Sequence, residues 1–309
     1  MRPGGGRCAA ELYALMVRRM RRLRQTKVTG SFPRSHAEGS MDRQLAIVFA
    51  LTFLINLIGS LAYSVRIAGV RTGRIALSFS LFNILVLVSR TANTFQTPLL
   101  AKRVEHGLHV PTAVEGALGD FRWLLFAASL ATVVGAVLTP TFQRLFTRAV
   151  EAFARNRSLP RLLLRALSPA GLAHLRDAAV LPSPANVVTE GTLRRPAAAG
   201  VLLVNTLATA VSTVGVFAAL YAGYLAPELR VTASNLSGVI NGLATILLFA
   251  IVDPYLAMLN DDVVTGRGAE PAFRRAVVGM LGSRLAGTAL AQLLLLPAAS
   301  LIAHLARVM

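Results

Sequence analysis

Six long apolar segments constrain the fold of this 309-residue chain more than any other feature of its sequence. They are residues 44–64, 75–100, 123–140, 197–225, 232–256 and 281–303. A helix needs roughly 20 apolar residues to cross about 30 Å of hydrocarbon. Because lipid offers no partner to backbone polar groups, such segments cross it as helices. The sequence therefore predicts an all-α polytopic integral membrane protein with about six transmembrane helices.

The composition excludes other classes of protein. Only 15% of the residues are charged, whereas soluble domains contain about a quarter. The net charge of +18 comes from basic residues that flank apolar spans, which favours anionic lipid headgroups and not nucleic acid as partners. The single cysteine, Cys8, excludes a disulfide within the chain. We expect no metal site and no cofactor.

The chain divides into four regions by composition. They are a basic extension (1–43), transmembrane helices 1–3 (44–142), an amphipathic basic loop (143–196) and transmembrane helices 4–6 (197–309). Two interpretations of the extension stay open: a native chain that starts at Met41, or a basic arm on anionic lipid. In the loop, residues 143–157 alternate apolar and arginine side chains, which favours an interfacial helix over a solvated connector.

The distribution of basic residues predicts the orientation in the membrane. Counted from Met41, the first, third and fifth loops carry 15 Lys and Arg residues against 7 on the opposite side. The positive-inside rule then places these three loops in the cytoplasm and the N-terminus outside. Counted from Met1, the two sides are nearly equal, at 15 against 16, so the orientation depends on the start.

The two halves of the chain share several residues at nearly constant spacing. The pairs, 156 to 158 residues apart, are Gly59 and Gly215, Tyr63 and Tyr221, Asn83 and Asn241, Pro98 and Pro254, and Pro140 and Pro297. A duplicated unit of three helices would invert its second copy and give a 3+3 repeat. Since glycine and proline are common here, coincidence is the alternative interpretation.

The second span contains the most polar segment found inside any of the six. Arg90 lies in its middle, and insertion of an arginine there costs roughly 2.5–3.5 kcal/mol. Asn83 and Asn93 share its helix face, and Gln96 follows. One interpretation is a site for an anionic group such as phosphate, whose oxygens match the guanidinium fork. The alternatives are a buried pair with Asp253 and snorkelling to the interface.

Two further features carry charge close to the spans. The first loop holds Arg66, Arg71 and Arg74 without an acid, so it either follows the positive-inside rule or gathers phosphates. Asp253 precedes a proline in the fifth span, where it is a counter-ion or a proton and cation site. Asn241 either lines a cavity or bonds between helices. No nucleophile with an adjacent base is recognisable, so we expect no enzymatic activity.

Two long strings carry a resemblance to a known family. Residues 61–100, LAYSVRIAGVRTGRIALSFSLFNILVLVSRTANTFQTPLL, and residues 220–266 are similar to the Amj (alternate to MurJ) lipid II flippases of the bacterial envelope. The resemblance extends over about 41–306. It implies a multi-pass protein of the bacterial cytoplasmic membrane that moves undecaprenyl-pyrophosphate-linked peptidoglycan precursor to the outer leaflet for cell wall synthesis. Lipid II and membrane lipids would be its partners.

The resemblance does not identify contact residues, so the site is our own hypothesis from the residues. The expected pyrophosphate ligands are Arg66, Arg71, Arg74 and Arg90. The expected partners of sugar and peptide groups are Asn83, Asn93, Gln96 and Asn241. Asp253 is an ion-pair or coupling residue. The alternative function is an integral-membrane enzyme or a transporter that acts on another polyprenyl-phosphate lipid.

Overall fold

The computed structural model describes residues 43–107, 113–156, 168 and 196–309. The chain divides into two units, Met1–Asp42 and Arg43–Met309, and only the second is described here. The basic extension, apart from Arg43, and most of the predicted 143–196 loop therefore lie outside the described residues.

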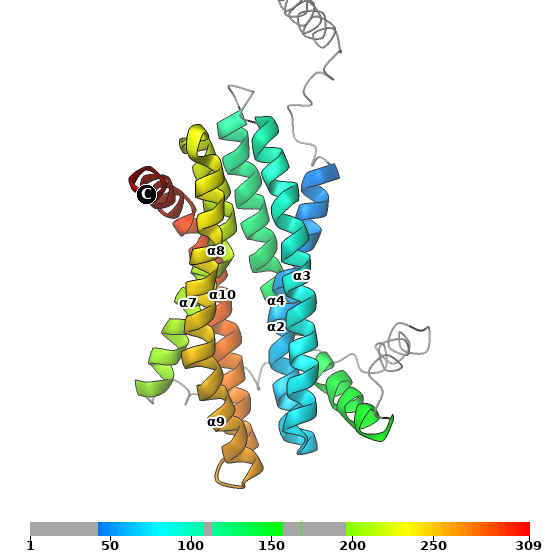
Figure 1. Ribbon diagram of the computed structural model, residues 1–309. Coiled ribbons are helices and arrows are strands. Elements are labelled where there is room, and N and C mark those ends of the chain that lie inside the picture. The colour runs from blue at the N-terminus through cyan, green and yellow to red at the C-terminus, as the bar shows by residue number, and fades with distance from the viewer. Residues whose placement is uncertain (1–42, 108–112, 157–167, 169–195) are drawn as a thin grey trace, which may run out of the picture. The chain divides into compact units, whose positions relative to one another are not determined.

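The described unit contains helices and no strand (Figure 1). In chain order they are α2 (Arg43–Thr72), α3 (Ile75–Gly107), α4 (Ala113–Asn156), α7 (Pro196–Leu225), the short η3 (Pro227–Leu229), α8 (Arg230–Leu247), the π-helical turn η4 (Leu248–Val252), α9 (Asp253–Val264) and α10 (Glu270–Val308). Six helical stretches are long and apolar enough to cross a membrane, with η3 to α9 forming the fifth. The predicted all-α fold with six spans is confirmed.

The helices extend beyond the apolar segments from which they were predicted. The sequence places the end of the first span at Ser64, yet α2 continues to Thr72 and stops before Gly73, whose φ of 64° suits glycine. Likewise, residues 143–156 are helical and continue α4 past Pro140. Figure 1 shows this last part of α4 running away from the bundle. Its Val150 is buried against Val65.

The six spans pack as two triplets with the same internal arrangement. In the first triplet α2 packs extensively against α4 and α3, while α3 and α4 touch little. In the second triplet α7 packs in the same way against α10 and α8, while α8 and α10 touch little. The two triplets meet mainly through α4 and α10. This matching pattern favours a duplicated unit, and the inverted 3+3 repeat stays a prediction.

Apolar side chains gather toward the two ends of the bundle. The larger cluster joins the beginning of α2 to the ends of α3, α7 and α10, and it includes Leu45, Val104, Phe217 and Leu295. Three smaller clusters lie toward the opposite end, around Phe273, Leu256 and Val65. Several buried polar side chains lie between these clusters, at the middle of the spans, among them Asn56, Gln96 and Thr209.

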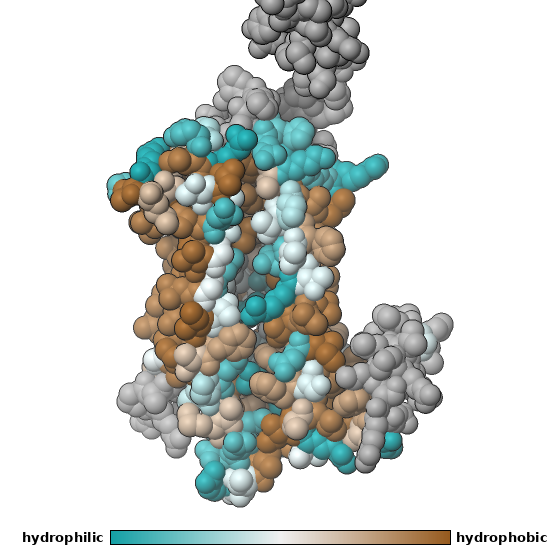
Figure 2. Space-filling view, in the orientation of Figure 1, coloured by the Kyte–Doolittle hydropathy of each residue, from teal (hydrophilic) through white to brown (hydrophobic). Residues whose placement is uncertain are grey.

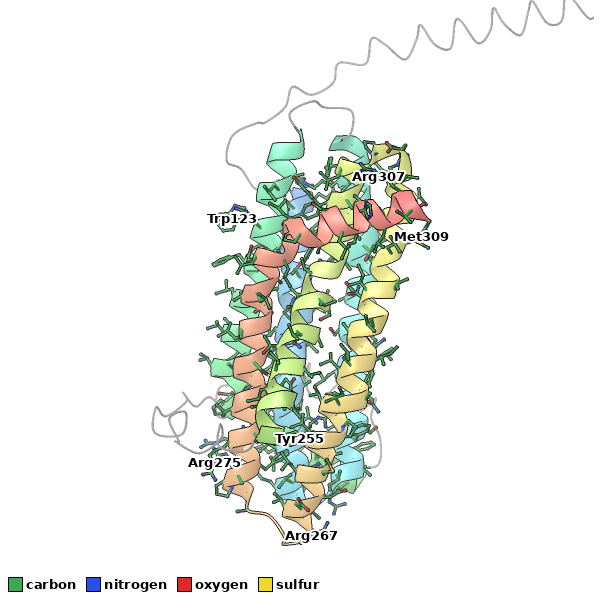
Figure 3. All side chains as sticks on the ribbon, turned by 90° about the vertical axis from the view of Figure 1, so that its left-hand side faces the viewer. Trp123, Tyr255, Arg267, Arg275, Arg307 and Met309 are labelled. Carbon is green, nitrogen blue, oxygen red and sulfur yellow. The ribbon has the colours of Figure 1, made fainter. Side chains whose placement is uncertain are left out.

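Basic side chains mark both ends of the helices, and the Trp123 ring lies toward one of these ends. Figure 3 shows Trp123 and Arg307 toward the end that holds the C-terminus, and Arg267 and Arg275 at the opposite end. Such residues anchor spans at the two membrane interfaces. The hydrocarbon therefore covers the middle of the bundle, where the polar side chains lie.

Candidate functional site

A cavity of about 260 Å³ lies at mid-height between the two triplets. Residues of α2, α3, α7, α8 and α10 line it. Among the described residues the lining contains two arginines, Arg90 and Arg284, uncharged polar side chains and three apolar ones, but no acid. Such a site attracts an anion because its positive charge is not compensated.

The depth of the cavity follows from helix geometry. At 1.5 Å per residue, Arg90 is about 23 Å from the start of α3 and about 26 Å from its end. In Figure 2 a hollow runs between α3 and α8, bordered by hydrophilic and neutral colours, while both flanking surfaces are mostly hydrophobic. In the described part of the chain α3 and α8 do not pack along one another. The polar interior is thus accessible from the side of the bundle that faces lipid.

Four of the predicted site residues meet in this cavity: Arg90, Asn93, Gln96 and Asn241. The Gln96 Nε2 donates a 2.9 Å hydrogen bond to the Thr52 hydroxyl, which itself donates to a backbone oxygen. The Asn241 Oδ1 is buried without a hydrogen-bond partner. Arg90 is exposed, and no described carboxylate pairs with it. Its guanidinium is therefore available to a ligand.

Arg66 lies outside the cavity, in an ion pair with Asp253. The distance from its Nη2 to the Asp253 Oδ1 is 2.5 Å, and the two side chains are 6% and 24% exposed. The guanidinium also lies 4.7 Å from the centre of the Phe82 ring, within cation–π range. Asp253 therefore pairs with Arg66 rather than with Arg90.

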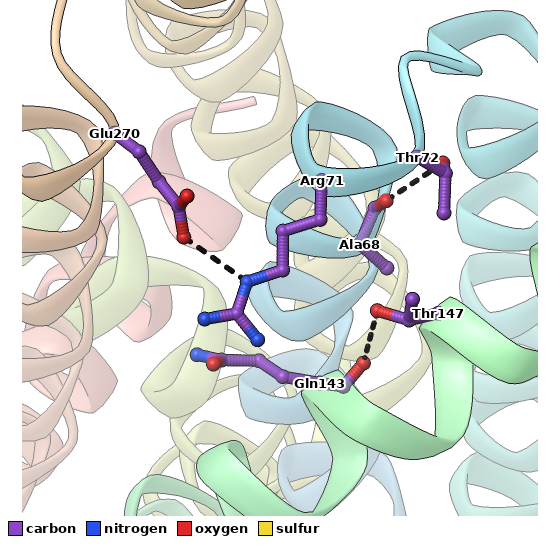
Figure 4. A network of polar contacts seen from close by, with 6 residues as sticks. All are labelled: Ala68, Arg71, Thr72, Gln143, Thr147 and Glu270. Atoms are coloured by element: carbon purple, nitrogen blue, oxygen red, sulfur yellow. Dashed lines mark hydrogen bonds and ion pairs between the residues drawn. The ribbon is translucent and has the colours of Figure 1, made fainter.

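The other predicted residues lie toward the ends or the surface of the helices. Arg71 pairs with Glu270 at 3.0 Å, and Figure 4 shows its guanidinium between Glu270 and the Gln143 side chain. Arg74 is exposed in the turn before α3, and Asn83 is exposed on α3 outside the cavity lining. The Arg66 and Arg71 ion pairs both join the first triplet to the second at the same end of the bundle.

Sequence reasoning did not select Arg284, although it lines the cavity. Its Nη2 is 3.5 Å from the Asn56 Oδ1, its Nε is buried without a partner, and no described acid pairs with it. The guanidinium lies over Gly59, where a Cβ would be 2.3 Å from Nη2. The apolar run suggests a span beginning at 281, but α10 begins at Glu270. Arg284 is therefore about 21 Å from the start of its helix.

A polar network separates the cavity from the ion pair. The Asn205 Nδ2 donates to the Ser283 Oγ at 2.6 Å and to the Met280 carbonyl at 3.2 Å. The Tyr63 hydroxyl lies 3.5 Å from the Asn205 Oδ1. These contacts link α2, α7 and α10, so this end of the bundle is held across both triplets.

Comparisons with known proteins identify the family. The model of the family described as "Alternate to MurJ" (Amj) matches residues 51–306. A curated relative named lipid II flippase Amj, from Bacillus subtilis (strain 168), is 38% identical over 265 residues, which cover 85% of this chain and 97% of the relative. No solved structure matches the chain. The chain belongs to the Amj (alternate to MurJ) family.

Proposed function

We propose that this protein is a lipid II flippase, a multi-pass transporter of the bacterial cytoplasmic membrane that moves the peptidoglycan precursor to the outer leaflet. The similarity to a lipid II flippase over almost the whole relative supports this function. The observation that carries the mechanism is the polar, acid-free cavity with Arg90 at mid-span.

The chemistry of the cargo explains why such a cavity is needed. Lipid II has an anionic pyrophosphate and a large polar head, which hydrocarbon does not accept unaided. Arg90 offers a donor fork that matches phosphate oxygens. The Asn93, Gln96 and Asn241 amides offer hydrogen bonds to neighbouring sugar or peptide groups. Binding of the anion offsets the roughly 2.5–3.5 kcal/mol that insertion of Arg90 costs.

The hollow between α3 and α8 supports a division of the cargo between two environments. The head occupies the cavity while the prenyl chain stays in lipid. Because about 260 Å³ lies below the roughly 300–1,000 Å³ of sites for drug-sized ligands, the cavity holds the pyrophosphate and adjoining groups, not the whole head. Transport therefore requires wider states than the one described.

The ion pairs of Arg66 and Arg71 favour a role in gating. Both join the triplets at the end of the bundle that carries the first, third and fifth loops, which we place in the cytoplasm by the positive-inside rule. Entry of the head from the inner leaflet requires the triplets to separate there. Asp253 then acts through its pair with Arg66, and coupling to protons is the alternative role.

Complementation tests the proposed function. A bacterial strain depleted of its essential lipid II flippase is expected to grow when it expresses this protein and to fail with Arg90→Ala at equal membrane levels. The matched control is Arg267→Ala, because Arg267 is 70% exposed near the end of α9 and far from the cavity lining. Growth supported by Arg90→Ala at the wild-type rate would contradict the role of Arg90.

A further inference from the structure

Two guanidiniums face the same cavity from opposite triplets. Arg90 comes from α3 of the first triplet, and Arg284 from α10 of the second. The cavity lining contains no acid among the described residues, so neither charge is neutralised inside it. A ligand bound between them meets two fixed cations on different rigid elements.

Arg284 is partly buried, and it has fewer partners than an arginine inside a helix bundle normally has. A guanidinium has five N–H donors, yet the hydrogen bond found for this one is the 3.5 Å contact with Asn56, near the outer limit for such bonds. Its Nε is buried with no partner. Buried polar groups are nearly always bonded, so an unsatisfied one beside a cavity is a place where a ligand can complete the hydrogen bonds. For a guanidinium, that ligand is an anion with several oxygens.

The number of cations indicates the kind of anion. A diphosphate that links a prenyl chain to a sugar carries a negative charge on each phosphate, whereas a monophosphate linkage carries a single charge. We propose, on the basis of the function proposed above, that Arg284 and Arg90 form a two-cation site that selects diphosphate-linked over monophosphate-linked polyprenyl lipids. Arg284 is the specificity-determining residue of the pair, because Arg90 alone suffices for one phosphate.

Gly59 holds Arg284 in this position. A Cβ there would lie 2.3 Å from Nη2 and 2.8 Å from Cζ, distances that no stable contact allows. The clash involves the far end of a flexible side chain and not backbone, so alanine displaces the guanidinium and leaves the helices in place. Gly59 is therefore a positioning residue that acts through Arg284. Gly282, on the same helix as Arg284, has no neighbour within 4 Å of its would-be Cβ and provides the control.

The test compares two lipids with the same prenyl chain and the same sugar, linked by a diphosphate or by a monophosphate. Binding of each is measured to the full-length protein in lipid nanodiscs, for the wild type, Arg284→Gln, Gly59→Ala and Gly282→Ala. We expect Arg284→Gln to weaken diphosphate binding by about tenfold or more and to change monophosphate binding little, since hydrogen bonds to a charged group are lost from one phosphate only. Gly59→Ala shifts the ratio of diphosphate to monophosphate affinity in the same direction, and Gly282→Ala leaves this ratio unchanged.

The outcomes separate this inference from the proposed function. Equal weakening of both lipids by Arg284→Gln, or a wild type that binds the two lipids equally, overturns the selectivity even if the protein moves lipid II. A wild type that binds neither lipid overturns the proposed function and this inference together. If Arg284→Gln does not give folded protein, the ratio of diphosphate to monophosphate affinity is measured for Gly59→Ala instead. A ratio equal to that of the wild type in this variant refutes the inference.

Discussion

Removal of the Asp253 carboxylate perturbs the ion pair that joins α2 to α9. In Asp253→Asn the Arg66 guanidinium, whose side chain is 6% exposed in the wild type, keeps its charge but loses the carboxylate charge 2.5 Å away. Breaking a buried pair by removing one partner costs about 3–5 kcal/mol. Because the Asp253 side chain is 24% exposed and Arg66 keeps its contact with Phe82, we expect a loss near the lower end of that range.

The Arg71–Glu270 pair provides the comparison, since it joins the same two triplets at the same end. Its side chains are 32% and 40% exposed, and exposed pairs contribute about 0–1 kcal/mol. Glu270→Gln is therefore expected to lower stability far less than Asp253→Asn. A double variant, Arg66→Met with Asp253→Asn, removes both charges and is expected to recover much of the loss.

Denaturant unfolding of the purified protein in detergent micelles measures these differences. A second readout is the labelling rate of a cysteine placed at Ile67, which is buried against α10 of the second triplet, in a Cys8→Ser background. If the pair holds this end closed, Asp253→Asn accelerates labelling by a membrane-impermeant maleimide, and Glu270→Gln accelerates it less. Equal stability and equal labelling in the two variants would mean that burial does not make the Arg66–Asp253 pair the stronger link.

Three further predictions concern packing, the cavity and orientation. Gly287→Ala should lower the free energy of unfolding by about 1–3 kcal/mol, because its Cβ would lie 2.6 Å from the Thr206 carbonyl oxygen of α7. Gly282→Ala, on the same helix, should leave the free energy of unfolding unchanged. Equal free energies for the two variants in chemical unfolding would contradict the close approach of α10 to α7. Gln96→Leu should reduce lipid II transport in the complementation assay with little loss of protein, because it removes an amide from the cavity wall; wild-type growth would exclude Gln96 from the site. A reporter inserted within residues 158–190 should read as cytoplasmic, and an external signal would reverse the orientation.

The sequence predicted well those features that depend on one helix alone, such as the spans and the polar residues within them. Apolar length predicts the six spans, since each backbone must satisfy its own hydrogen bonds in lipid. The cost of an arginine in mid-span singles out Arg90, and the helical period groups it with Asn93. Both lie in the cavity lining. These inferences needed no knowledge of which helices are neighbours.

Helix ends and tertiary partners were less accessible from the sequence. The apolar segment ends near Ser64, so the sequence places Arg66 in a loop. The helix nevertheless continues to Thr72, because helices end at backbone signals such as the positive φ of Gly73 and not where the apolar segment ends. Arg284 was missed for the same reason, because α10 begins at Glu270, well before the apolar segment, and places Arg284 deep in the bundle. The partner of Asp253 is 187 residues away, and no periodicity distinguishes Arg66 from Arg90 as that partner.

Direct measurement of lipid II translocation shows whether the acid-free cavity at mid-span carries the anionic head across. The wild type, Arg90→Ala and Arg267→Ala are each reconstituted in proteoliposomes, and the rate at which labelled lipid II reaches the opposite leaflet is compared with that of protein-free vesicles. We expect translocation by the wild type and Arg267→Ala, and a rate near that of protein-free vesicles for Arg90→Ala. Translocation by Arg90→Ala at the wild-type rate would contradict this expectation.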